Sequence, residues 1–361
     1  MIQNLFAWSL AYTIGLGLWL LGGAISFYGL LKLRRRWRDK PRARKFVHAG
    51  LGLWMLLALL TLPEIGCALF YDQTDAFSQT NVSRRWFALH VQPNRDGFRD
   101  DQPLPTQLSP GQQSIVFVGD SFTFGHGVKH IADRFTNRLR SRWDRERPDQ
   151  YLVSNVSVPG TDIRMLTDVL VPELYRDSRP IDLLVYVFVP NDIEYFDDRT
   201  AQHLASLAAM QPHGWLFRET YFYNLLWYRW QALRRPEASA YYGYLKGAYT
   251  SEPWPRFARK LDQLRLTCDS HGTRLAIVAF PFLSDLEGAD TFAVAHEQLG
   301  KYCREHNTPY LDLRPTLVPH VSEGLVVNRF DSHPNPRAHE LAAEALGPWL
   351  EAQLVSPTPE P

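Results

Sequence analysis

A serine, a histidine and an aspartate stand in local contexts suited to nucleophilic acyl transfer. Ser121 follows Gly119 and Asp120 at the end of the apolar run 114–118, a pattern typical of a buried strand that ends in a tight turn. A serine hydroxyl is a weak nucleophile at neutral pH and needs a base such as histidine. The imidazole in turn needs a carboxylate that fixes its tautomer and stabilises the imidazolium. His333 and Asp331 meet both needs from one short segment.

Each of these residues also has an ordinary interpretation. The tripeptide 119–121 occurs by chance in many chains, and residues 331–335 can simply cap the amphipathic helix expected over 337–354. His126 is a rival base, but it sits on the nucleophile's own loop without a carboxylate partner there. We therefore predict His333 as the base. A helix that begins at 122–124 would place its positive end at the Ser121 hydroxyl.

Two further strand ends supply hydrogen-bond donors. The runs 151–157 and 183–189 are typical of strands, and they lead to Gly160 and Asn191. Ligands bind at the carboxyl ends of the strands in an open parallel sheet, and acyl transfer needs donors aimed at the developing oxyanion. The backbone N–H groups of Ser121 and Gly160 and the Asn191 amide could supply three. A turn glycine and a helix cap are the ordinary alternatives.

Together these blocks resemble those of the SGNH (GDSL-type) hydrolases, which contribute Ser, Gly, Asn and His. The resemblance covers roughly residues 90 to 354. It implies a serine esterase without metal or organic cofactor. It also implies the following roles: Ser121 as nucleophile, His333 as base, Asp331 as its orienting acid, Ser121, Gly160 and Asn191 as oxyanion donors, and Asp120 and Asp192 as supporting residues.

The chain departs from the family pattern at two positions. Val189 stands where the third block usually has glycine, which could tighten the site. The acid stands two residues before His333 instead of the common three. That spacing is similar to the SGNH-like domains of alginate O-acetyltransferases, so acyl transfer to a sugar stays open beside hydrolysis.

Two apolar segments precede this domain. Residues 5–31 and 46–70 are each long enough to cross a hydrocarbon core of roughly 30 Å, and the basic segment 32–45 lies between them. A cleaved signal peptide fits poorly, because residues 1–4 carry no basic charge and the first apolar stretch is too long. The positive-inside rule places the basic segment in the cytoplasm. We therefore expect a multi-pass protein of the inner membrane with its catalytic domain on the periplasmic side.

The charge distribution supports this division. Residues 1–71 hold nine Lys/Arg and two Asp/Glu, a net charge of +7, whereas the whole chain has +1. The remainder is therefore mildly acidic, at −6, and lacks the basic surface of a nucleic-acid-binding protein. The basic segment alone could bind nucleic acid, but its position between two apolar segments favours the membrane interpretation.

Strands and helices alternate in the C-terminal part, with further strands expected over 274–280 and 309–313. This alternation predicts an α/β fold with a five-stranded parallel sheet flanked by helices, an SGNH/flavodoxin-like three-layer arrangement, preceded by two transmembrane helices. The expected organisation is a membrane hairpin over 1–71, a linker and domain entry over 72–100, a catalytic domain over 101–354 and a disordered tail over 355–361.

An aromatic-rich insertion is expected over 193–255. It could form a lid, a sugar-stacking surface or a pad against the bilayer, or its aromatic residues could simply pack a helical insertion onto the sheet.

Two cysteines occupy similar positions before the last two strands. Cys268 and Cys303 are expected as buried thiols, while the exported location would also permit a disulfide. A zinc site with His271 and His306 is a further alternative, although the spacing matches no known finger pattern.

The sequence therefore predicts a membrane-anchored serine esterase that removes ester-linked acyl groups, foremost O-acetyl groups, from a saccharide or a small ester. Its expected partners are the substrate and membrane lipid, with no nucleic acid. The alternatives are an O-acyltransferase, which would need a membrane partner to deliver acyl groups, and a non-catalytic glycan-binding or scaffold module.

Overall fold

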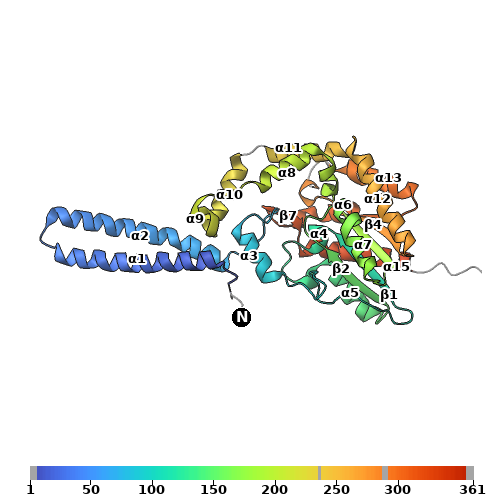
Figure 1. Ribbon diagram of the computed structural model, residues 1–361, viewed down its shortest axis with the longest axis horizontal. Coiled ribbons are helices and arrows are strands. Elements are labelled where there is room, and N and C mark those ends of the chain that lie inside the picture. Colours follow the sequence, from blue (N-terminus) through green and yellow to red (C-terminus); the bar gives the residue numbers. More distant parts are fainter. Residues whose placement is uncertain (1–5, 235–236, 287–291, 355–361) are drawn as a thin grey trace, which may run out of the picture. The chain divides into compact units, whose positions relative to one another are not determined.

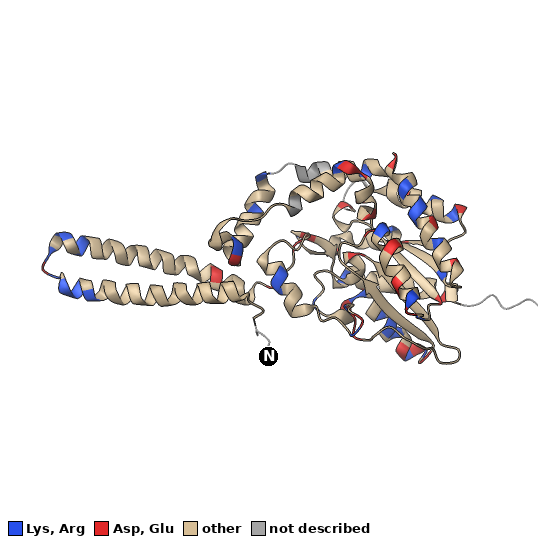
Figure 2. Ribbon diagram, viewed as in Figure 1, with Lys and Arg blue, Asp and Glu red and all other residues tan. Residues whose placement is uncertain are grey.

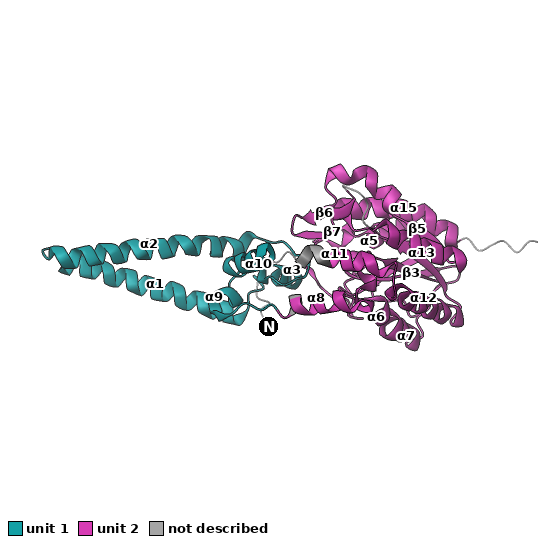
Figure 3. Ribbon diagram, turned by 90° about the horizontal axis from the view of Figure 1, so that it is seen from above, with its two compact units in different colours: residues 1–89, 210–235 teal, residues 90–209, 236–361 magenta. Residues whose placement is uncertain are grey.

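The computed structural model describes residues 6–234, 237–286 and 292–354, and Figure 1 labels its elements. The chain forms two compact units, which are described separately: residues 1–89 with 210–235, and residues 90–209 with 236–361 (Figure 3). The aromatic-rich insertion is thus shared between the two units. The predicted disordered tail lies outside the described residues.

Two long apolar helices, α1 (Leu10–Arg36) and α2 (Pro41–Phe70), dominate the first unit. Both are long and apolar enough to cross a membrane. Lys and Arg gather at the turn between them (Figure 2). The helices extend further into the basic segment than predicted, because Lys and Arg are good helix formers and favour the C-terminal end of a helix dipole. This unit also holds α9 (Gly214–Glu219), α10 (Phe222–Arg234) and nearly all of α3 (Asn81–His90).

The second unit is built on the predicted five-stranded parallel sheet. Its strands have the order β2-β1-β3-β4-β5. The strands β6 and β7 form a separate, two-stranded antiparallel sheet. The strands are β1 (Gln113–Gly119), β2 (Tyr151–Ser157), β3 (Leu183–Phe188), β4 (Arg274–Ala279), β5 (Tyr310–Asp312), β6 (Val326–Asn328) and β7 (Asp331–Pro334).

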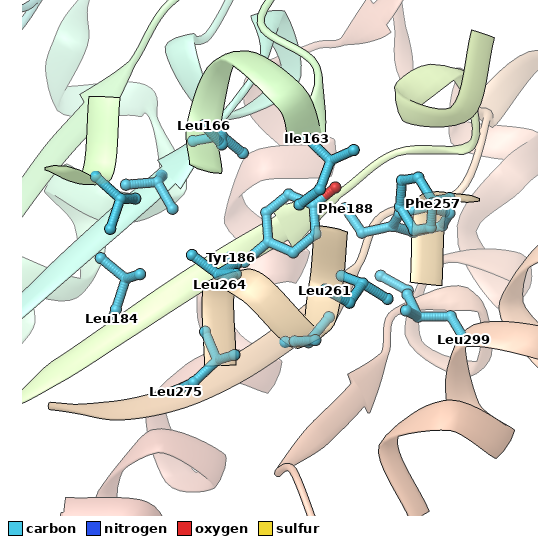
Figure 4. Close-up of a cluster of buried hydrophobic side chains, with 14 of the residues drawn as sticks. Ile163, Leu166, Leu184, Tyr186, Phe188, Phe257, Leu261, Leu264, Leu275 and Leu299 are labelled. Atoms are coloured by element: carbon cyan, nitrogen blue, oxygen red, sulfur yellow. The ribbon is translucent and has the colours of Figure 1, made fainter. Parts of the chain in front are cut away.

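Helices cover both faces of the sheet, which confirms the predicted three-layer fold. The strand side chains alternate between two buried clusters, so that Val116 and Val118 enter one and Ile115 and Phe117 the other. The first cluster, shown in part in Figure 4, includes side chains of α7, α12 and α13, and the second includes those of α5, α14 and α15. The helices of this unit are α4 (Ser121–Phe124), η1 (Ile131–Asp133), α5 (Phe135–Glu146), α6 (Ile163–Met165), η2 (Leu166–Leu170), α7 (Val171–Arg176), η3 (Pro190–Phe196), α8 (Asp198–Ala208), α11 (Glu237–Ala248), α12 (Pro253–Ser270), η4 (Leu283–Asp285), α13 (Ala293–Glu305), α14 (Arg314–Leu317), η5 (Val318–Glu323) and α15 (Pro336–Leu354).

Candidate active site

The register of the sheet brings three predicted site segments to one edge. Gly119, the last residue of β1, lies opposite Ser157 of β2 and Val187 of β3. The three strands therefore end together, and the residues that follow them are Ser121, Gly160 and Asn191. This edge is the carboxyl end of the sheet, where ligands bind in open α/β folds.

A tight turn carries the chain from β1 to Ser121. A Cβ atom at Gly119 would overlap the Thr123 hydroxyl and come within 3.0 Å of the Val187 carbonyl oxygen, so only glycine fits there. Asp120 accepts a hydrogen bond from the Phe122 N–H at 2.8 Å and thereby caps α4. This helix spans only four residues, and Gly125 ends it with a φ of +74°. Because α4 is so short, the backbone N–H groups around Ser121, and not the dipole of a long helix, are the donors near its hydroxyl.

The three predicted catalytic side chains form a continuous hydrogen-bonded chain. His333 Nε2 lies 2.8 Å from Ser121 Oγ, and His333 Nδ1 lies 2.5 Å from Asp331 Oδ1. Asp331 is 1% exposed and His333 is 7% exposed. A buried carboxylate on Nδ1 leaves Nε2 free to accept the proton of the serine hydroxyl, which is the geometry of a nucleophile, base and orienting acid.

The segment around His333 is fixed on both sides. Asp331 and His333 belong to β7, which pairs with β6. Asn335 then caps α15, because its Oδ1 accepts hydrogen bonds from the N–H groups of Arg337 and Ala338, both at 3.0 Å. The predicted capping role of Asn335 is thus real, and it coexists with the role of His333 at the site.

His126 also belongs to this site, and our inference that it lacks a carboxylate partner is wrong. Its Nε2 lies 3.4 Å from Asp331 Oδ2. Its ring stacks on the His333 ring, with the centroids 4.1 Å apart and the planes 14° from parallel. One carboxylate therefore serves two imidazoles. The pairing escaped sequence reasoning because His126 and Asp331 meet only through the tertiary fold.

The predicted oxyanion donors follow β2 and β3. Gly160 has a φ of +78°, and a Cβ atom there would meet open space, so backbone conformation and not crowding requires glycine. Asn191 lies in η3, and its side-chain amide partly offsets the rise that burial causes in the pKa of Asp120. Because an amide has two N–H groups, Asp120 can hold Asn191 while the second N–H serves an oxyanion.

Asp120 and Asp192, predicted as supporting residues, are both buried. Asp192 accepts hydrogen bonds from the Tyr186 hydroxyl at 2.6 Å and from the Val189 N–H at 3.1 Å. Burial and the neighbouring Asp120 raise the pKa of Asp192 well above its ordinary value. Burial also raises the pKa of Asp120. The Val189 N–H bond fixes the backbone just before Asn191, so Asp192 holds the third block in place.

Two buried arginines that sequence reasoning missed support the loop that carries His126. Arg99 donates hydrogen bonds to the carbonyl oxygens of Gly125 at 2.7 Å and Val128 at 2.6 Å. Arg134 packs so closely that a Cβ atom at Gly125 would lie 2.6 Å from its Cδ. No local pattern in the sequence predicts these contacts. They bring Arg99 and Arg134 to the same loop, the one that carries His126.

The described residues contain one group of three ligand-type side chains that could hold a metal ion, namely His126, Asp331 and His333. Their ligand atoms lie within 4.8 Å of one another. A metal on His333 Nδ1 would replace the proton that this nitrogen shares with Asp331. The 2.8 Å approach of His333 to Ser121 therefore suits proton transfer better than metal binding.

The cysteine alternatives resolve toward free thiols. Cys67, Cys268 and Cys303 are all buried and free. Burial raises the pKa of Cys268 to about 11 and that of Cys303 to about 12, which makes both thiols unreactive. His271 stacks on Tyr175 with the ring centroids 3.9 Å apart, so it has a partner other than a zinc site.

Comparisons with known proteins complete the description. No protein-family model matches the chain, and no curated protein matches it. Among solved structures, the chain is similar to TesA at 16% identity and a TM-score of 0.43, over 67% of this chain and 100% of that chain. It is similar to a two-domain esterase (CEX) active on acetylated mannans at 17% identity and a TM-score of 0.37, over 70% of this chain and 52% of that one. It is also similar to a member of the lipolytic protein G-D-S-L family from Veillonella parvula DSM 2008, at 18% identity and a TM-score of 0.37, over 64% and 94% of the two chains. Of these three structures, one is named as an esterase and one as a lipolytic protein.

Proposed function

We propose that this protein is a membrane-anchored serine ester hydrolase. The observation that carries the proposal is the chain of hydrogen bonds from Asp331 through His333 to the Ser121 hydroxyl. No purely structural role requires a nucleophile, a base and an orienting acid in this order at the carboxyl edge of a parallel sheet.

In the proposed reaction, Ser121 Oγ attacks the ester carbonyl while His333 Nε2 takes the hydroxyl proton. The N–H groups of Ser121 and Gly160 and the Asn191 amide stabilise the oxyanion. His333 then returns the proton to the leaving alcohol. Water, deprotonated by the same imidazole, finally hydrolyses the acyl-enzyme.

A saccharide ester is the proposed substrate, because aromatic rings extend from the site to the surface. The His333 ring lies 5.3 Å from Phe122, Phe122 lies 6.3 Å from Phe282, and Phe282 lies 5.9 Å from Tyr242. Tyr242 is 39% exposed and can offer its face to a sugar ring.

The test uses the full chain in lipid nanodiscs with p-nitrophenyl acetate and an acetylated polysaccharide. Ser121→Ala and His333→Ala should each lower kcat/KM by about 10³-fold or more, and Asn191→Ala by about 10²–10³-fold as the loss of one oxyanion donor. Ser332→Ala, between the two catalytic residues of β7, is the matched control and should retain activity. Near-normal activity of Ser121→Ala would refute Ser121 as the nucleophile, and absence of turnover in the unsubstituted chain would favour a binding module.

The second candidate is an O-acyltransferase, favoured by the spacing of two residues between Asp331 and His333. Partition of a pre-formed acyl-enzyme between water and an added oligosaccharide separates the two reactions. Transfer of most acyl groups to the sugar at millimolar concentration would establish the transferase.

A further inference from the structure

The hairpin of α1 and α2 shows how deep each of its residues lies in the membrane, provided that it crosses the membrane as the proposed function requires. The turn between α1 and α2 carries the basic residues and marks the cytoplasmic boundary. Glu64 lies eighteen residues beyond Phe46 in α2, a rise of about 27 Å. Gly15 lies sixteen residues from Leu31 in α1, a rise of about 24 Å. Both positions therefore fall near the far edge of a hydrocarbon core of roughly 30 Å.

The segment 210–235 packs against the hairpin at this depth. The backbone N–H groups of Tyr221 and Phe222 donate to the two carboxylate oxygens of Glu64, each at 2.8 Å. The Tyr223 hydroxyl donates to the carbonyl oxygen of Leu60 at 2.7 Å. Because an unpaired carboxylate in an apolar span is costly, the two N–H bonds at the start of α10 account for this buried acid.

The Trp215 ring of α9 lies against the backbone of α1. A Cβ atom at Gly15 would overlap this ring, so glycine is required for the contact. Trp215 and the two residues after it, Leu216 and Phe217, remain 38–44% exposed. α9 therefore attaches to the hairpin while large apolar surface stays uncovered.

α10 has two distinct faces. Asn224 and Tyr228 are buried within the unit, whereas Leu226, Trp230 and Leu233 form an exposed stripe at spacings of four and three residues. Leu233 is 84% exposed. The Arg234 guanidinium lies over the Trp230 ring at 4.0 Å, which places a cation beside the stripe. An apolar stripe with tryptophan and adjacent arginine is typical of helices that lie in the membrane–water interface.

We propose that α9 and α10 form an interfacial lipid anchor on the non-cytoplasmic side of the membrane. The stripe Leu226–Trp230–Leu233, together with Trp215, Leu216 and Phe217, enters the boundary between headgroups and acyl chains. The occupant is lipid and not a protein partner, because the contacts with Leu60, Glu64 and Gly15 hold these helices at the depth where the hairpin itself faces lipid.

The experiment places an environment-sensitive fluorophore on single cysteines in the full chain, reconstituted in nanodiscs. Cys67, Cys268 and Cys303 are replaced by alanine, and retained esterase activity verifies the fold of each labelled protein. Leu233→Cys reports on the stripe. Ala232→Cys is the matched control, since it is exposed on the same helix and points about 100° away. Leu20→Cys, an exposed position near the middle of α1, reports on the hairpin.

We expect a nitroxide on the lipid acyl chains to quench the label at Leu233, and aqueous iodide to quench it about fivefold less than the label at Ala232. Equal iodide quenching at the two positions would overturn the anchor. Protection from iodide without nitroxide quenching would also overturn it and indicate a protein contact, such as a second copy of the chain. If Leu20 itself escapes the nitroxide, the membrane anchoring in the proposed function fails instead.

Discussion

Substitution of His126 tests whether the second imidazole positions His333, the proposed base. His126 Nε2 lies 3.4 Å from Asp331 Oδ2, within reach of an N–H donor, while the other oxygen of Asp331 contacts His333. In His126→Phe the ring can still stack on His333, but Asp331 loses one of its hydrogen bonds. A hydrogen bond to a charged group contributes about 1.5–3 kcal/mol, and the long distance places this one at the low end, so kcat/KM should fall about tenfold.

Two companion variants separate the hydrogen bond from the ring. His126→Gln keeps an N–H donor for Asp331 and should recover part of the loss. His126→Ala removes both the donor and the stacked ring, which leaves a cavity beside His333, and should lower kcat/KM about 100-fold. The assay is p-nitrophenyl acetate turnover, with thermal unfolding measured on the same samples to show that each variant is folded.

Two results would refute this reasoning. A loss of about 10³-fold in a folded His126→Phe protein, equal to that in His333→Ala, would make His126 a proton-transferring residue. Unchanged kcat/KM in His126→Ala would show that Asp331 and His333 keep their geometry without the second imidazole.

Two further predictions concern the substrate and the pH dependence of stability. Tyr242→Ala should raise KM for acetylated polysaccharide about tenfold through loss of ring stacking and leave p-nitrophenyl acetate turnover unchanged. Tyr244→Ala, two residues away, should change neither. Equal effects of Tyr242→Ala on both substrates would exclude a sugar-stacking role. Burial, with a smaller effect of Arg134, lowers the pKa of His339 from 6.5 to about 3. Below pH 6.5, His339 therefore binds a proton in the unfolded chain but stays neutral in the folded chain. The neutral His339 contributes fully to the free energy of unfolding above pH 6.5, and this contribution falls by about 2 kcal/mol at pH 5. His339→Gln should therefore flatten the pH dependence of urea unfolding between pH 7 and 5. An unchanged slope would contradict this.

Local patterns predicted the parts of the site that are fixed by strands. The apolar run 114–118 and Gly119 identify a buried strand and a turn that only glycine permits, and the same logic locates Gly160 and Asn191 at neighbouring strand ends. The sequence alone therefore predicts most of the residues that line this edge of the sheet.

Contacts between distant polar residues could not be predicted in the same way. Periodicity shows which face of an element is buried, but it does not show which buried charge meets which donor. The bonds of Arg99 to the loop after Ser121, and of Glu64 to the start of α10, both join segments that are far apart in sequence. The aromatic segment illustrates the same limit, because its residues 210–235 belong to the first unit and α11 to the second.

The short spacing between Asp331 and His333 follows from the conformation of β7. Residues i and i+2 of a strand point to the same side, so the two side chains meet at 2.5 Å while Ser332 points away. An acid three residues before the histidine would need a different backbone path to reach the same nitrogen. The spacing therefore follows from how the segment is folded, and its likeness to that of acetyltransferases does not by itself decide which acceptor receives the acyl group. Whether water or a sugar hydroxyl reaches the acyl-enzyme depends on what lies beside His333, where Phe122 and the row of rings leading to Tyr242 are the surfaces that decide it.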